Sequence, residues 1–218
     1  MKDYLDSIRT KYLSKIIVAL VDDIEKHSNI NDLYTLSSAV KLAHWLYIIG
    51  DTETALYFAN IVSELDLTQY SNVKGFQDSA ACAKSYKCDA LVLCSTICEE
   101  RADAEKSERY WEYFLTVRLE TNKWGKPDDG KVARKRWKRN LETGDLFDTC
   151  ESQYQTAKIK EHIRGMIYYS YNALIVLLFM KRAGGSELYP INKLAKMIDE
   201  RVQYLKENID KTDCKDFV

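Results

Sequence analysis

The chain has 218 residues, of which 46% are hydrophobic and 30% charged, and its formal net charge is −1 at pH 7. This apolar content excludes a disordered chain, and the balanced charge excludes a protein that is basic throughout. With only two prolines and eight glycines, the sequence has too few turn residues for a β-rich protein of this length, so long helices with short connections are predicted.

The cysteines and the apolar runs bear on the cellular compartment. Six cysteines are an even number, but a chain of this size can build its core without disulfides, so reduced thiols are predicted. Asp3, Asp6 and Arg9 interrupt the stretch in which a secretory leader would be apolar. The longest mostly apolar run, 166–180, has about 15 residues, whereas a membrane-spanning helix needs roughly 20. We therefore expect a cytoplasmic protein with no membrane segment, in which this run forms a buried core helix.

Helical periodicity begins near the amino terminus. One apolar helix face is predicted from residues that recur at spacings of three and four: Tyr4, Leu5, Ile8, Tyr12, Leu13, Ile16, Ile17 and Leu20. After a turn at 27–31, a second helix is predicted to run to Gly50, because glycine commonly ends a helix, and Asp51 is placed to cap a third. Residues 32–66 are therefore predicted to form a helical hairpin.

Two further hairpins are predicted downstream. The first spans 79–119 and turns at 101–103, where an aspartate can cap the following helix. The second spans 149–209 and turns at the Gly-Gly-Ser sequence 184–186. Pro190 falls near the start of its last helix, a position at which proline is tolerated because the backbone N–H has no helical partner there.

Part of the first hairpin, LAHWLYIIGDTETALYFANIV, resembles a tetratricopeptide-type helix pair, with small residues Ala43, Ala55 and Ala59 where two helices approach closely. The resemblance implies antiparallel helices stacked side by side. The turns fall at irregular intervals, unlike those of a strict repeat. The predicted fold class is therefore all-α, with about eight helices in stacked antiparallel hairpins, arranged either as an irregular TPR-like array or as a helical bundle.

One segment interrupts the helices. TNKWGKPDDG, at 121–130, contains both glycine and proline and is predicted to be a loop. We expect a single domain, 1–218, with subregions 1–120 and 131–218 joined by this loop. Residues 1–120 carry 13 Lys and Arg against 19 Asp and Glu, whereas the rest of the chain carries 19 against 14. Such polarity can guide a partner of complementary charge.

The sequence contains no recognisable catalytic constellation. The three histidines, His27, His44 and His162, lack partners at metal-ligand spacing, and each is better explained as a turn, packed or solvated residue. Cys94 and Cys98 share a helix face, but a zinc site would need further ligands, so they are predicted to be core residues. No phosphate-binding glycine loop or nucleophile elbow is present. We therefore predict a protein that is not an enzyme and binds no metal or cofactor.

The strongest nucleic-acid signal is a basic cluster on a predicted helix at 131–139. Its members are Lys131, Arg134, Lys135, Arg136, Lys138 and Arg139, with Trp137 among them. Phosphates attract such a stripe, and an aromatic side chain can stack on a base. The alternative is a solvated helix face with Trp137 packed inward. Because no known nucleic-acid module surrounds the cluster, nucleic acid is the less favoured partner.

An acidic and aromatic segment precedes the loop. The predicted partner-binding residues are Glu99, Glu100, Asp103, Glu105, Glu108, Tyr110, Glu112 and Tyr113. Carboxylates beside large aromatic side chains suit recognition of a basic protein, because charge guides the encounter and aromatic rings supply buried anchors. The alternative is a solvated helix whose aromatic side chains face the core. Trp111 and Phe114 are expected to face inward, which leaves Tyr110 and Tyr113 as the candidate contacts.

These features together resemble the all-helical cytoplasmic immunity proteins of bacterial contact-dependent and other polymorphic toxin systems. The resemblance is carried by size, by the helical hairpins and by acidic-aromatic sequence such as EERADAEKSERYWEYF. It implies that the protein neutralises a cognate toxin, such as a basic nuclease, by tight stoichiometric binding. Two alternatives remain: a helical-repeat scaffold that holds a peptide or protein in a concave groove, and a nucleic-acid-associated regulator that uses the helix at 131–139. Steep weakening of binding by salt would indicate phosphate contacts.

Overall fold

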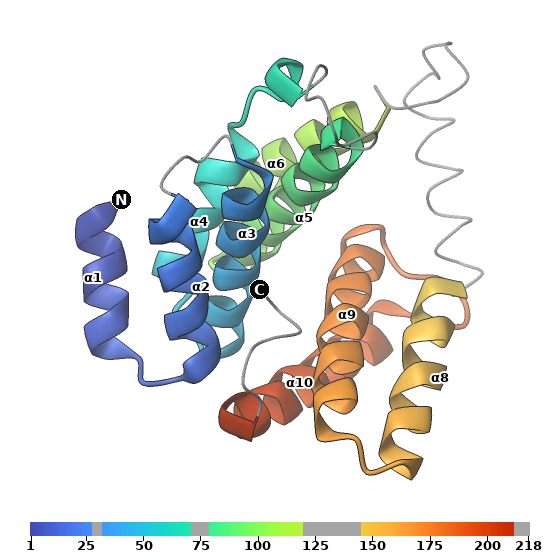
Figure 1. The fold of residues 1–218 in the computed structure, drawn as a ribbon. Helices are drawn as coiled ribbons and strands as arrows, with labels where there is room; N and C mark the ends of the chain where they lie inside the picture. Colours follow the sequence, from blue (N-terminus) through green and yellow to red (C-terminus); the bar gives the residue numbers. More distant parts are fainter. Residues whose placement is uncertain (28–31, 71–78, 120–144, 212–218) are drawn as a thin grey trace.

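The computed structural model describes residues 1–27, 32–70, 79–119 and 145–211. These residues form nine α-helices and two short 3-10 helices and contain no strand, which confirms the all-α prediction of about eight helices in hairpins (Figure 1). In chain order the elements are α1 (Lys2–Lys11), α2 (Lys15–His27), α3 (Leu33–Ile48), α4 (Thr52–Ser63), η1 (Leu67–Tyr70), α5 (Ser79–Glu100), α6 (Ala104–Leu119), α8 (Asp145–Ile159), α9 (Ile163–Arg182), α10 (Ile191–Asn208) and η2 (Ile209–Lys211).

The amino-terminal residues correct one prediction. The apolar periodicity over residues 4–20 belongs to two helices, because the backbone turns extended at Tyr12 (φ −119°, ψ 123°) between α1 and α2. Leu13, predicted on the common apolar face, is 91% exposed at this bend. Arg9 then holds α1 against α2 by donating to two α2 carboxylates at 2.6 Å. Periodicity could not reveal the bend, since it contains no glycine or proline.

The two central hairpins are as predicted. Gly50 adopts φ +92° between α3 and α4, and the Asp51 side chain accepts a hydrogen bond from the Thr54 backbone N–H at 3.2 Å. Between α5 and α6, Ala102 adopts φ +59° and Asp103 caps α6. Each helix from α1 to α6 packs on the next one in sequence, so this part of the chain is a serial antiparallel stack (Figure 1).

The carboxy-terminal region has one more turn than predicted. The hairpin expected over 149–209 consists of three helices, because the chain also reverses between α8 and α9 at Glu161, a non-glycine residue with φ +53°. The expected turn between α9 and α10 is present, with Gly184 and Gly185 at positive φ and Pro190 directly before α10.

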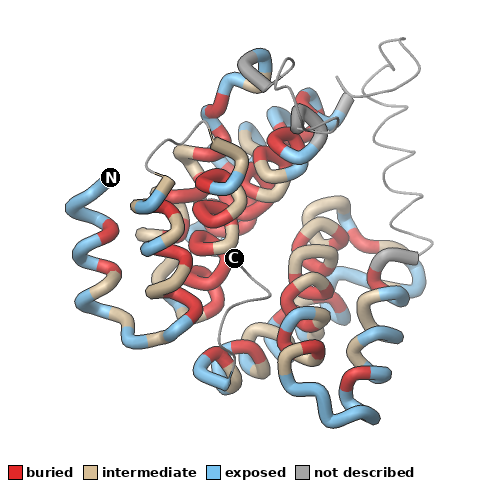
Figure 2. The backbone as a smooth tube through the Cα atoms, viewed as in Figure 1, coloured by how far each residue is buried: buried red, intermediate tan, exposed pale blue. Residues whose placement is uncertain are grey.

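A single hydrophobic cluster unites the helices on both sides of the predicted loop 121–130, which itself lies outside the described residues. Trp45 on α3 stacks on Tyr171 of α9 with ring centroids 5.7 Å apart, and Phe114 on α6 meets Phe179 of α9 at 5.5 Å. Figure 2 shows buried residues along the facing sides of these helices. Residues 1–119 and 145–211 therefore share one core.

Helix α9 is the buried helix predicted from the apolar run. By length and composition it could cross a membrane, but half of its most apolar window is buried inside the fold. It packs against α8, α10 and α5, and buries a stripe that includes Ile167, Leu174 and Leu177. Because α9 packs against three other helices, its apolar composition is that expected of a central core helix.

Candidate protein-interaction surface

The six predicted acidic residues lie on one continuous part of the fold. Glu99 and Glu100 end α5, Asp103 lies in the turn, and three glutamates belong to α6. Glu105, Glu108 and Glu112 are spaced by three and four residues, so they share one helix face. All three are exposed. We call these three side chains the α6 acidic strip.

Asp103, Glu100 and Glu99 each contact a neighbouring side chain. Asp103 accepts from the Lys106 backbone N–H at 3.2 Å and forms an ion pair with the Lys106 ammonium at 2.9 Å, and these contacts hold the pKa of Asp103 below its usual range. Glu100 accepts a 2.7 Å hydrogen bond from the Tyr47 hydroxyl. Glu99 lies 3.5 Å from both Lys181 and Arg182 on α9. Asp103 therefore caps α6, Glu100 contacts α3 and Glu99 contacts α9, roles that the sequence prediction did not assign to them.

The middle residue of the α6 acidic strip lies beside α9. Glu108 lies 3.5 Å from Arg182, whose guanidinium carbon is 5.4 Å from the centroid of the Trp111 ring. Because Glu108 is 59% exposed, this ion pair is weak and leaves most of the carboxylate open to solvent. The opposite face of α6 is anchored by Trp111 and Phe114, which are buried as predicted and stack with centroids 4.8 Å apart. The strip is therefore carried on a rigidly packed helix.

The two candidate tyrosines line a pocket at the edge of the same helix. This pocket, of about 430 Å³, lies between the end of α4 and α6 and is also lined by Ser63, Glu64, Lys106 and Arg109. Tyr113 is 43% exposed, whereas Tyr110 is half-buried and donates to the Asn60 side-chain oxygen at 2.6 Å. Burial raises the pKa of Tyr110 to about 12, so its hydroxyl stays a neutral donor. We call this cavity the α4–α6 pocket.

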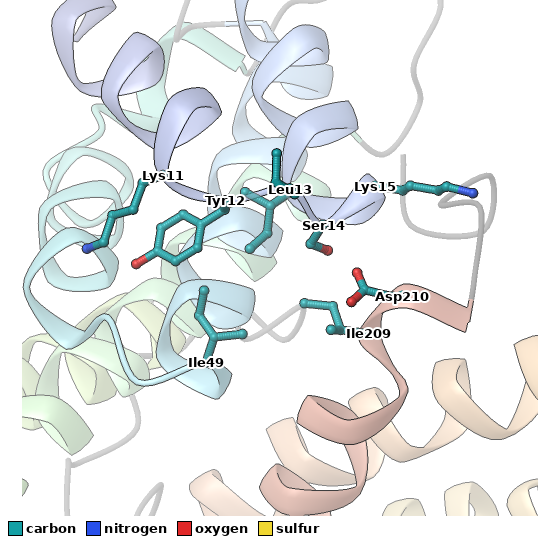
Figure 3. Close-up of a pocket in the computed structure, with 9 residues that line it drawn as sticks. Lys11, Tyr12, Leu13, Ser14, Lys15, Ile49, Ile209 and Asp210 are labelled. Carbon is teal, nitrogen blue, oxygen red and sulfur yellow. The ribbon is translucent and has the colours of Figure 1, made fainter.

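A second pocket, of about 510 Å³, lies at the bend between α1 and α2 (Figure 3). Its walls come from that bend, from Ile49 after α3, and from Ile209 and Asp210 of η2. Lys11 and Tyr12 both donate to the Asp51 carboxylate, at 3.0 and 2.6 Å. The sequence did not reveal this pocket, because its walls are separated by up to two hundred residues along the chain.

Of the three pockets described here, only one is lined by a histidine, and that one has no carboxylate in its wall. His162 lines a pocket of about 300 Å³ together with Arg164, Gly165, Tyr168 and Tyr169. His44 is 2% exposed, and its Nδ1 lies 3.0 Å from the Val40 carbonyl oxygen and 3.3 Å from the Tyr171 hydroxyl. His44 is therefore a packed core residue, whereas His162 is exposed directly before α9.

The cysteines in the described ranges form no metal site and lie mainly in the core. Among the described residues, no group of three His, Cys, Asp or Glu side chains is placed to hold a metal ion. Cys88, Cys94 and Cys98 are buried, and the five cysteines in the described ranges are free. Burial raises the pKa of Cys88 to about 12, which keeps that thiol protonated and unreactive. Cys94 and Cys98 are thus core residues, as predicted.

We expect the stability of the protein to depend on the protonation of His44. Burial lowers the pKa of His44 from 6.5 to about 4, so the unfolded chain takes up a proton before the folded one. The contribution of neutral His44 is complete above pH 6.5 and is lost as the pH falls toward 4, by about 2 kcal/mol at pH 5. Urea denaturation at pH 7.5 and pH 5 will measure the loss in free energy of unfolding for the wild type and for His44→Gln, whose side chain does not titrate.

Comparing the wild type with His44→Gln isolates the contribution of His44 to the pH dependence of the free energy of unfolding. Burial also raises the pKa of Asp89 to about 7, which changes stability with pH in the opposite direction, but equally in both proteins. The wild type should lose about 2 kcal/mol more than His44→Gln between the two pH values. Equal losses would show that His44 is protonated in the folded protein as readily as in the unfolded one.

The predicted basic patch, Lys131, Arg134, Lys135, Arg136, Lys138 and Arg139, lies outside the described residues.

Comparison with known proteins yields one match. A family model matches residues 7–209, and its description is a family of unknown function, DUF6707. No curated protein and no solved structure matches the chain.

Proposed function

Since the chain belongs to DUF6707, a family of unknown function, we propose a function from the surface that it presents. The protein is a cytoplasmic protein-binding module that captures a basic partner on the α6 acidic strip. In its specific form, it is an immunity protein that neutralises a cognate bacterial toxin by stoichiometric binding, without chemistry of its own.

The observation that carries this proposal is the pairing of charge with rigidity on α6. Glu105, Glu108 and Glu112 are exposed on one face, while Trp111 and Phe114 fix the opposite face in the core. A partner that binds such a helix does not have to order it first, so less conformational entropy is lost on association. Three carboxylates in a row attract a positively charged surface and raise the rate of encounter.

The toxin is the favoured class of partner because of the charge distribution. Residues 1–120 carry six more acidic than basic residues, and a nuclease must present a basic surface to bind nucleic acid. Covering that surface would block the substrate without any need for an active site in the inhibitor. The partly exposed Tyr113 beside the strip supplies an aromatic contact of the kind that is enriched at interface centres.

The test begins with the product of the reading frame next to the one that encodes this chain. If that product has a toxin domain, we expect a one-to-one complex with the purified protein. Replacing Glu105, Glu108 and Glu112 together by lysine should weaken this complex about tenfold or more, mainly through slower association. Surface plasmon resonance at two salt concentrations will measure the rate constants.

A matched variant controls for charge reversal in general. Glu187, Glu200 and Glu207 are equally exposed and lie on or just before α10, and their replacement by lysine should leave the affinity unchanged within about threefold. The proposal is wrong if the neighbouring product does not bind at micromolar concentration, or if both triple variants weaken binding equally. Binding of DNA or RNA that falls steeply with salt would instead favour the nucleic-acid alternative.

A further inference from the structure

A buried lysine lies beneath the α4–α6 pocket. Lys87 on α5 is 3% exposed, and its ammonium donates to the Leu65 carbonyl oxygen at 2.6 Å and to the Tyr113 hydroxyl oxygen at 2.7 Å. The same ammonium lies 4.7 Å from the centroid of the Tyr113 ring. In the part of the chain that the structure describes, Lys87 forms no ion pair with a carboxylate. Both hydrogen-bond partners are neutral, and Asp66, whose carboxylate interacts with the Lys87 charge, is exposed to solvent, so the buried ammonium is only weakly compensated.

Tyr113 connects this cation to the pocket. Because its oxygen accepts the hydrogen bond from Lys87, the phenol hydrogen is not used in that contact. The side chain is 43% exposed and lines the pocket, so the hydroxyl is available as a donor there. A hydroxyl that accepts a bond from an ammonium is polarised into a stronger donor.

The rest of the wall also supplies donors. Arg109 is exposed and lines the pocket, and it forms no ion pair with any described residue. Lys106 keeps donors beyond the one that it directs to Asp103. Glu64 is the single carboxylate among the six lining residues. Two cations, Lys106 and Arg109, thus line the cavity against one carboxylate, Glu64, and Lys87 lies beneath it.

We infer that the α4–α6 pocket binds an oxyanion, a carboxylate or a phosphate group, through Arg109 and Tyr113, with Lys87 as the buried counter-charge. The planar guanidinium can donate two parallel hydrogen bonds to such a group. This inference goes beyond the proposed function, because the α6 acidic strip recognises positive charge on one side of α6 while the pocket recognises negative charge on the other. Tyr113 lies at the border of both sites, but none of the three glutamates of the strip lines the pocket, so charge reversal of the strip and Arg109→Gln test the two sites separately.

The test measures binding of inorganic phosphate and of acetate to the full chain, at constant ionic strength, by NMR titration. We expect saturable shifts at millimolar concentration for residues that line the pocket. Arg109→Gln should weaken binding about tenfold, and Tyr113→Phe, which removes one hydroxyl, several-fold. Lys196→Gln removes one exposed cation on α10 and serves as the matched control. Linear, non-saturating shifts, or equal weakening by the control, would overturn the inference.

A third probe distinguishes the source of the anion. A blocked tripeptide, acetyl-Gly-Glu-Gly-amide, presents a carboxylate as a protein partner would. Tighter binding of this peptide than of acetate supports a protein-borne acidic side chain, whereas tighter binding of phosphate supports a free or esterified phosphate. If none of the three probes saturates the pocket, the inference is wrong, while the α6 acidic strip and its partner remain open to their own test.

Discussion

Replacing Trp45 by alanine is expected to lower the free energy of unfolding by about 3–5 kcal/mol. The Trp45 side chain is fully buried on α3 and stacks on Tyr171 of α9, with ring planes inclined by 18°. The substitution removes this aromatic contact and leaves a cavity that the surrounding helices can only partly fill. Urea denaturation followed by circular dichroism will measure the loss.

An aromatic residue on the same helix provides the control. Tyr34 is 57% exposed near the start of α3, and Tyr34→Ala should change the unfolding free energy by about 1 kcal/mol or less. Because Trp45 and Tyr171 lie on opposite sides of the predicted loop, Trp45→Ala should shift a single unfolding transition. Two separate transitions, with only one of them shifted, would show that the two regions do not share a cooperative core.

Gly185→Ala is the second substitution with a large expected effect, about 2–4 kcal/mol of destabilisation. Gly185 adopts φ +68° in the turn between α9 and α10, where a side chain is strained. A Cβ atom there would also lie 2.6 Å from the Tyr189 carbonyl oxygen and 3.3 Å from the Ile191 backbone nitrogen. Both of these neighbours are backbone atoms, so neither can move aside by changing rotamer.

Substituting the adjacent glycine, Gly184, separates the cost of the backbone conformation from the cost of the steric clash. Gly184 has φ +91°, but a Cβ atom at Gly184 would meet nothing within 4 Å. Gly184→Ala should therefore show only the conformational cost, about 1–2 kcal/mol. Thermal unfolding of both variants will measure the difference, and equal destabilisation would mean that the turn relaxes to accommodate the Gly185 side chain.

The sequence predicted the main features of the acidic surface but not the roles of all its members. Spacings of three and four placed Glu105, Glu108 and Glu112 on one helix face, and helical geometry alone is enough for that. Glu99 and Glu100 were predicted as binding residues too, but their contacts with α9 and with Tyr47 depend on helices distant in sequence. The sequence therefore did not predict that Glu99 and Glu100 also contact neighbouring helices.

Some turns were predictable from local residue types, and others were not. Gly50, Asp51 and the glycine pair at 184–185 marked their turns in the sequence, since a left-handed backbone or a capping carboxylate favours these residue types. The bends at Tyr12 and Glu161 contain no glycine or proline. Neither has a residue type that marks a helix end, so the sequence predicted continuous helices there.

What the sequence determined by itself was the helical class, the positions of the glycine and aspartate turns, and the charged face of α6. Each of these depends on interactions between residues a few positions apart. The stacking of Trp45 on Tyr171, the break between α8 and α9, and the burial of Lys87 beneath Tyr113 were decided only by the tertiary structure. Burial and charge compensation depend on which distant helices meet, and helical periodicity carries no information about that choice.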